Sequence, residues 1–125
     1  MVILITINKP LIGDEEKKEV MKVLESGRLT DSSFDGGLMV REFEKSLAKF
    51  VGVKHAIAVN SGTSALMASL IALNIGYGDE VLLPSFTFVA TANAVLARGA
   101  KPVFVDINLD DYTMSIDDLE RKINN

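Results

Sequence analysis

The sequence contains no cysteine, no tryptophan and a single histidine, His55. Without cysteine there are no disulfide bonds and no thiolate metal sites. One histidine also argues against a histidine-based zinc site or a Ser-His-Asp triad, because both need further partners. We therefore expect no metal site, and we interpret His55 as a structural residue.

Long apolar runs are also lacking. The longest, residues 65–75, is well short of the roughly 20 residues that span a bilayer. The apolar start, residues 1–5, has no basic leader and breaks at residues 8–10, which argues against a signal peptide. The formal net charge is −4, with both signs mixed along the chain and no basic block. These features predict a cytoplasmic protein with neither a membrane nor a nucleic acid as its partner.

The N-terminal part of the chain carries two helical patterns. The first opens at Asp14 and stops at Gly27, and the second closes at Gly52. Glycine after the last turn of a helix is a common stop signal. We therefore expect a helical segment over about residues 1–52, within a chain whose 48% hydrophobic content is sufficient for a core.

From about residue 53 to 125, apolar runs alternate with helical patterns. The runs at 56–59, 81–83 and 103–105 predict strands, of which the first is wholly apolar and is expected to be buried on both faces. Helices are predicted from the Ser-Gly-Thr turn to near Gly76, from about 87 to 98, and after Ser115, which forms an apparent capping box with Asp118. The alternation predicts a single partial α/β domain, a mostly parallel sheet with flanking helices.

The turn at residues 60–65 joins the first predicted strand directly to a helix. The first amides of a helix have no partner within the helix, and the helix dipole there favours an anion. Gly62 allows a ligand to approach the backbone closely, and Ser61 and Thr63 add hydroxyl groups. The turn is a candidate phosphate cradle; the alternative is that Ser61 or Thr63 only caps the helix.

An ordered set of short motifs resembles the opening of the sugar aminotransferases of the DegT/StrS type. The set covers nearly the whole chain at the family's spacing, and its clearest stretches are Pro10-Leu11-Ile12-Gly13-Asp14, Val59-Asn60-Ser61-Gly62-Thr63, Gly78-Asp79-Glu80-Val81, residues 84–91 and residues 99–106. The resemblance implies the large domain of a fold type I enzyme that depends on pyridoxal phosphate (PLP). It further implies amino transfer to a keto group on a nucleotide-linked sugar.

The resemblance also assigns roles to particular residues. Ser61, Gly62 and Thr63 match the turn that binds the PLP phosphate, and Phe88 matches the aromatic residue that stacks on the pyridine ring. A further set, matched to a loop on the substrate side, consists of Gly27, Leu29 and Thr30. The alternatives are that Phe88 is a core residue like Phe86 and that the loop only ends a helix.

The family's catalytic lysine and its pyridine-nitrogen acid would lie beyond residue 125, so we assign no catalytic residue. This implies an N-terminal fragment that is inactive by itself and does not bind PLP tightly. Strands that would neighbour residues 56–59 are also missing, which predicts a homo-oligomer or a second polypeptide that carries the rest. Two alternatives remain open: a non-enzymatic α/β remnant or interaction module that keeps a weak phosphate-binding turn, and a different PLP chemistry such as sugar dehydration.

Overall fold

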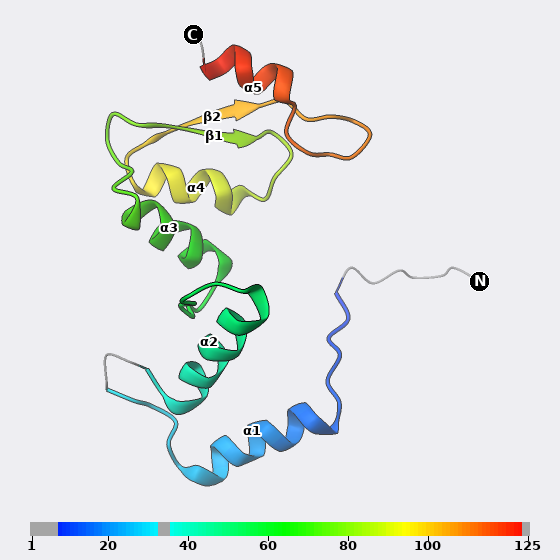
Figure 1. Ribbon diagram of the computed structural model, residues 1–125, viewed down its shortest axis with the longest axis vertical. Helices are drawn as coiled ribbons and strands as arrows, with labels where there is room; N and C mark the ends of the chain where they lie inside the picture. Colours follow the sequence, from blue (N-terminus) through cyan, green and yellow to red (C-terminus); the bar gives the residue numbers. More distant parts are fainter. Residues whose placement is uncertain (1–7, 33–35, 124–125) are drawn as a thin grey trace, which may run out of the picture. The chain divides into compact units, whose positions relative to one another are not determined.

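The computed structural model describes residues 8–32 and 36–123, and the chain divides into two compact units between Ala58 and Val59 (Figure 1). The first unit contains helices α1 (Asp14–Ser26) and α2 (Leu38–Val51). Both end where the sequence predicts. Gly27 and Gly52 adopt left-handed backbone, with φ of 66° and 78°, which glycine reaches without a steric penalty.

The helices of the first unit bury little apolar surface within the described residues. In α2 only Ala48 is buried, whereas the side chains of Phe43 and Phe50 are 56% and 89% exposed. The start of α1 is held by polar contacts instead, since the Gly13 amide donates to Glu16 Oε2 at 2.6 Å. The amphipathic pattern of the sequence therefore determines where the helices form, but the apolar side chains of α2 stay largely exposed.

The second unit is the α/β part of the chain. Its elements are α3 (Gly62–Ala72), β1 (Glu80–Pro84), α4 (Val89–Ala97), β2 (Lys101–Val105) and α5 (Ile116–Ile123). The two strands are parallel, with Glu80 opposite Lys101, and α4 makes the crossover between them. In Figure 1 the strands lie between α4 and α5, which gives a small α/β sandwich. The expected fold class is confirmed, with α3 ending at Ala72 rather than near Gly76.

The core of the second unit lies where α4 covers the sheet. Leu83 of β1, Val95 of α4 and Ala100 form the buried cluster, at 2%, 2% and 4% exposure. Leu70 of α3 packs against this cluster, so that α3 is anchored to the same core. This packing fixes the positions of α3 and α4 relative to the strands.

The prediction of a strand at residues 56–59 is wrong for this structure. Within the described residues the sheet has two strands, β1 and β2, and residues 56–59 pair with neither. The side chains of Ile57 and Val59 are 83% and 43% exposed, and the Ala58 amide donates to Glu44 Oε1 at 2.8 Å. A buried strand needs a neighbour on each side to pair with its backbone, and the described residues provide none.

The predicted capping box at the start of α5 is only half formed. The Asp118 amide donates to Ser115 Oγ at 3.4 Å, as a cap requires. The reciprocal bond is absent, because the Ser115 amide donates to the Asp106 carbonyl oxygen at 2.8 Å. The Asp118 carboxylate instead accepts the Asp106 amide at 2.7 Å, directly after β2.

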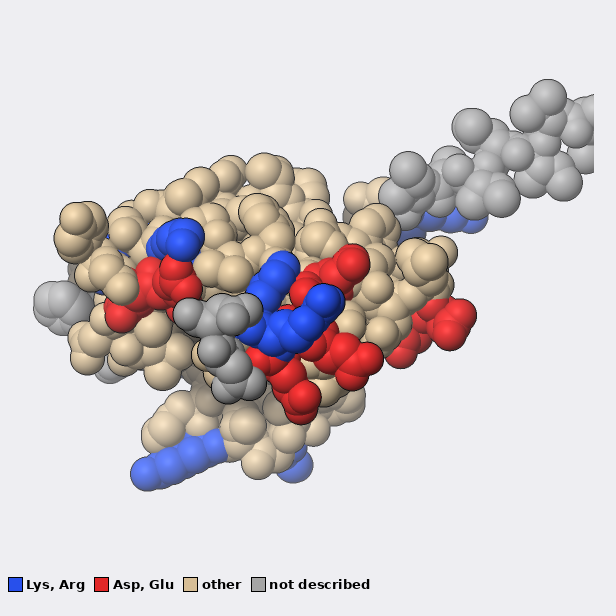
Figure 2. Space-filling view, turned by 90° about the horizontal axis from the view of Figure 1, so that it is seen from above, with Lys and Arg blue, Asp and Glu red and all other residues tan. Residues whose placement is uncertain are grey.

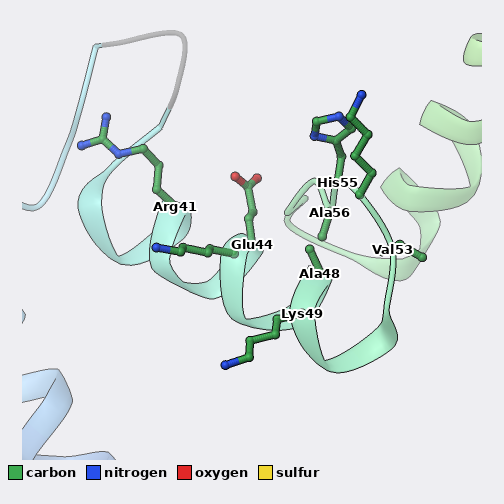
Figure 3. Close-up of a pocket in the computed structure, with 9 residues that line it drawn as sticks. Arg41, Glu44, Ala48, Lys49, Val53, His55 and Ala56 are labelled. Carbon is green, nitrogen blue, oxygen red and sulfur yellow. The ribbon is translucent and has the colours of Figure 1, made fainter.

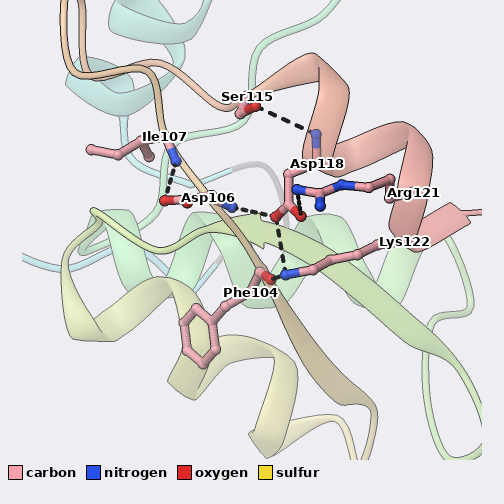
Figure 4. A network of polar contacts seen from close by, with 7 residues as sticks. All are labelled: Phe104, Asp106, Ile107, Ser115, Asp118, Arg121 and Lys122. Atoms are coloured by element: carbon pink, nitrogen blue, oxygen red, sulfur yellow. Dashed lines mark hydrogen bonds and ion pairs between the residues drawn. The ribbon is translucent and has the colours of Figure 1, made fainter.

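The Asp118 carboxylate joins α5 to the end of β2 (Figure 4). It also lies 3.0 Å from Arg121 Nη2 and 3.1 Å from Lys122 Nζ, and Lys122 Nζ in turn donates to the Phe104 carbonyl oxygen. The Asp106 amide, followed by Lys122 and Arg121, holds the pKa of Asp118 below its ordinary value. These contacts account for the burial of this aspartate, which is 8% exposed.

Candidate phosphate-binding site

The helix cap predicted at the start of α3 is present. Ser61 has extended backbone, with φ of −163° and ψ of 159°, and its Oγ accepts the Ser64 amide at 3.1 Å. The Ala65 amide donates to the Ser61 carbonyl oxygen at 3.0 Å, which closes the first turn of the helix. Ser61 therefore satisfies the third amide of the helix.

The cap leaves the first two amides of α3 without a partner in the part of the chain that the structure describes. Among the described residues, no acceptor bonds the Gly62 or Thr63 amide. Gly62 is exposed, and a Cβ placed on it would meet no heavy atom within 4 Å, which means that the space over the turn is open. Capping and anion binding are thus compatible here, because the cap uses one amide and two others remain for a ligand.

The carboxyl ends of the strands form the edge of the sheet where ligands gather in α/β proteins. Helices α3 and α4 both run opposite to the two strand arrows in Figure 1, so their N-terminal ends lie toward the carboxyl ends of the strands. The positive ends of two helix dipoles are therefore directed toward the same edge.

Phe88 stands at the N-terminal end of α4. It is the N-cap residue of that helix, and its side chain is 77% exposed. Phe86 is 67% exposed and contacts the ring of Tyr112, with ring centroids 5.5 Å apart. Neither phenylalanine is a core residue in this structure, so an exposed aromatic face is available beside the N-terminus of α4.

The residues matched to the substrate-side loop lie in the other unit of the chain. Gly27 ends α1 in left-handed conformation, and Leu29 is 64% exposed. Thr30 is exposed and lies outside any helix or strand. Their roles toward a substrate stay predictions, since nothing in the first unit's geometry tests them.

Two polar residues of the turn were missed by the sequence reasoning. Ser64 Oγ donates to Asn60 Oδ1 at 2.6 Å, and Ser61 Oγ lies 2.9 Å from Ser64 Oγ. The signal that could have found them is the run of polar residues from 60 to 64, which places a hydroxyl group three residues after the cap. Hydrogen bonds among Asn60, Ser61 and Ser64 therefore stabilise the turn on both sides of Gly62.

A hollow lies along α2 in the first unit (Figure 3). It has a volume of about 440 Å³, and its lining includes Arg41, Lys49 and His55. Figure 3 shows Arg41 and Lys49 directed away from each other, and the Glu44 carboxylate is used by the Ala58 amide. These side chains do not converge on one point.

The described part of the chain offers no metal site as an alternative to the α3 turn. No group of three or more histidine, aspartate or glutamate side chains there could hold a metal ion. On the face that Figure 2 shows, acidic and basic side chains lie beside one another. No helix among residues 8–32 and 36–123 is both long and apolar enough to cross a membrane.

The comparisons of this chain with known proteins agree on one family. The model of the DegT/DnrJ/EryC1/StrS aminotransferase family matches residues 10–125. The spore coat polysaccharide biosynthesis protein SpsC of Bacillus subtilis is 52% identical over 108 residues, which is 86% of this chain and 26% of that protein. A UDP-N-acetyl-3-dehydro-α-D-glucosamine 3-aminotransferase of Acidithiobacillus ferrooxidans is 50% identical over 95 residues, or 76% of this chain and 26% of that enzyme.

A solved structure has the same fold over nearly the whole chain. The proposed sugar aminotransferase Spr1654 from Streptococcus pneumoniae, in its PLP form, superposes with a TM-score of 0.84 at 35% identity. The match covers 94% of this chain and 29% of that one. The chain thus spans about a quarter to a third of the length of the proteins it matches.

Proposed function

This chain belongs to the DegT/DnrJ/EryC1/StrS aminotransferase family, and we propose that it supplies the phosphate-binding part of a PLP-dependent sugar aminotransferase. The observation that carries the proposal is the pair of unpartnered amides, Gly62 and Thr63, beside open space at the start of α3. A phosphate group suits this turn, because it brings negative charge and several acceptor oxygens to a helix N-terminus.

The residues present fit PLP at its phosphate end. Gly62 and Thr63 would hold the phosphate through their amides, and the Thr63 hydroxyl would add a donor. Phe88, exposed at the start of α4, would cover one face of the ring, a contact worth on the order of 1 kcal/mol beyond the area that it buries. When bound, PLP supplies an electron sink for the transfer of an amino group.

The substrate that we propose is a keto sugar linked to a nucleotide. The A. ferrooxidans relative, named for a UDP-linked dehydro-glucosamine, supports this choice. None of the chain's lysines occupies a motif that matches the family's catalytic lysine. We therefore propose that the chain is inactive by itself and acts with a second polypeptide, or as part of a longer protein, that carries this lysine.

A phosphate titration tests the binding role directly. Amide NMR shifts of Gly62 and Thr63 would be followed as inorganic phosphate or PLP is added to the 125-residue chain. We expect a dissociation constant of about 1 mM, because one helix terminus supplies few bonds. We also expect no conversion of glutamate to 2-oxoglutarate in the presence of PLP.

The test variant is Gly62→Val, whose side chain would extend into the open space over the turn, where its Cβ meets no heavy atom within 4 Å. We expect its fold to be unchanged and its phosphate response to be lost. The matched control is Gly37→Val, because Gly37 also stands at the start of a helix, α2, and a Cβ there makes ordinary contact at 3.8 Å. Equal phosphate shifts in wild type and Gly62→Val would show that the turn is only a helix cap.

A further inference from the structure

The loop that follows β2 is closed on itself by backbone contacts. Ile107 and Met114 form an antiparallel bridge at its base. Inside the loop, the Asn108 amide donates to the Thr113 carbonyl oxygen and the Tyr112 amide donates to the Asn108 carbonyl oxygen, each at 2.9 Å. The backbone of the loop is therefore held by its own hydrogen bonds, so the loop itself sets the position of Tyr112.

Tyr112 adopts a backbone conformation that is uncommon for tyrosine. Its φ of 59° lies in the left-handed region, which glycine or asparagine occupies more readily. Its ring contacts that of Phe86, with centroids 5.5 Å apart and ring planes at 40°, a separation typical of paired aromatic side chains. Since other residues fit this backbone better, the feature that tyrosine brings to the position is its ring, and this ring packs on Phe86.

Phe86 belongs to the link between β1 and α4. The link starts at Ser85, whose amide donates to the Val105 carbonyl oxygen at 2.8 Å, and it ends at Phe88, the N-cap residue of α4. The contact of Phe86 with Tyr112 thus joins this link to the loop after β2. Phe88 itself is 77% exposed and belongs to no ring pair within the described residues. The backbone of the link therefore decides where the Phe88 ring points.

We propose that Tyr112 is a positioning residue for the cofactor ring, because by packing on Phe86 it holds the link in the conformation that presents Phe88. The inference rests on the proposed function, since a fixed Phe88 matters only if its ring stacks on PLP. A side chain that is already held in its binding orientation loses less conformational freedom when the ligand arrives. Loss of the Tyr112 ring should therefore weaken the binding of the pyridine ring and leave the binding of the phosphate group unchanged.

Two probes separate the ring from the phosphate. Pyridoxine 5′-phosphate has the ring and the phosphate group of PLP but no aldehyde that could react with lysine side chains, whereas methyl phosphate has the phosphate group alone. Both would be titrated against the 125-residue chain by the NMR shifts of the Gly62 and Thr63 amides. In wild type we expect pyridoxine 5′-phosphate to bind about fivefold more tightly than methyl phosphate, as one aromatic stacking contact would give. This preference should disappear in Phe88→Ala.

The test variant is Tyr112→Asn, which removes the ring but suits the left-handed backbone, so that the loop is kept. We expect the preference to fall from about fivefold to about twofold, with the affinity for methyl phosphate unchanged. Tyr112→Phe keeps the ring and should retain the wild-type preference. The matched control is Tyr77→Asn, because Tyr77 is 98% exposed and belongs to no ring pair in the described part of the chain, and we expect no change there.

A further variant, Phe86→Leu, tests the same contact from the other side. It should lower the preference as much as Tyr112→Asn does. The double variant should lose no more than either single variant, because both changes remove one and the same contact. Losses that add up in the double variant, or a loss in Tyr112→Phe, would show that the two rings do not act together and would overturn the inference.

The remaining outcomes separate this inference from the proposed function. If Tyr112→Asn keeps the wild-type preference while Phe88→Ala loses it, Tyr112 does not position Phe88, and the proposed function stands. If wild type shows no preference, or Phe88→Ala keeps it, the stacking role of Phe88 fails and this inference fails with it. Weaker methyl phosphate binding in Tyr112→Asn, or an equal effect of Tyr77→Asn, would show a general loss of structure and would also overturn the inference.

Discussion

Replacing Leu83 with alanine should lower the free energy of unfolding of the second unit by several times RT. Leu83 is 2% exposed and lies at the centre of the cluster with Val95 and Ala100. Full burial of a leucine side chain contributes roughly 2 kcal/mol, and the cavity left by Leu→Ala adds to the loss. Leu70 and Val81, which pack against the cluster, are only partly buried and can relax into the gap, so we expect a loss of about 3 kcal/mol, near the lower end of the usual range.

The assay can report on this unit alone. The chain has two tyrosines and no tryptophan, and Tyr77 and Tyr112 both belong to the unit from Val59 onward. Tyrosine fluorescence during urea unfolding therefore follows the second unit, mainly through Tyr112 beside Phe86. The control is Leu109→Ala, because Leu109 is 80% exposed, and we expect it to change the free energy of unfolding by less than about 0.5 kcal/mol. A loss below about 1 kcal/mol for Leu83→Ala, or equal losses for both variants, would refute this location of the core.

Two further predictions concern acid and association. Because the pKa of Asp118 is lowered in the folded protein, its contribution is present at neutral pH and is lost as the pH falls from the ordinary pKa of an aspartate through the lower folded value. The urea midpoint should fall less over that range in Asp118→Asn than in wild type, and equal falls would argue against the contact with β2. We also expect the chain to self-associate at micromolar concentration, because Phe43, Phe50 and Ile57 are 56%, 89% and 83% exposed. Light scattering that shows a monodisperse monomer would contradict this expectation.

The elements that the sequence predicted well are those whose cause is local. Gly27 and Gly52 end helices because of their own backbone freedom, and β1 and β2 form because their partners lie within one crossover of each other. Residues 56–59 have the composition of a buried strand, but pairing is a property of two segments. Composition alone could not reveal that the described residues hold no partner for it.

The candidate phosphate site shows the same difference between features with a local cause and features that depend on contacts. The glycine and the cap at Ser61 follow from the motif, and the structure places both at the start of α3. Asn60 and Ser64 could not be assigned, because the direction of a hydroxyl proton depends on the distances between side chains. Asp118 was predicted as half of a capping box for a similar reason, since an acid three residues after a serine can reach either back to the cap or across to another element.

The pairing of β1 with β2 has a consequence for the order of folding. Each residue of β1 lies opposite one that follows 21 positions later, as Glu80 and Lys101 show. Loops of this length close quickly, and topologies with such short sequence separations fold early. The strand–helix–strand unit can therefore form on the ribosome as soon as β2 has emerged. Residues 56–59 are made earlier and pair with neither β1 nor β2, so this apolar segment stays accessible to chaperones and prone to aggregation while the unit folds.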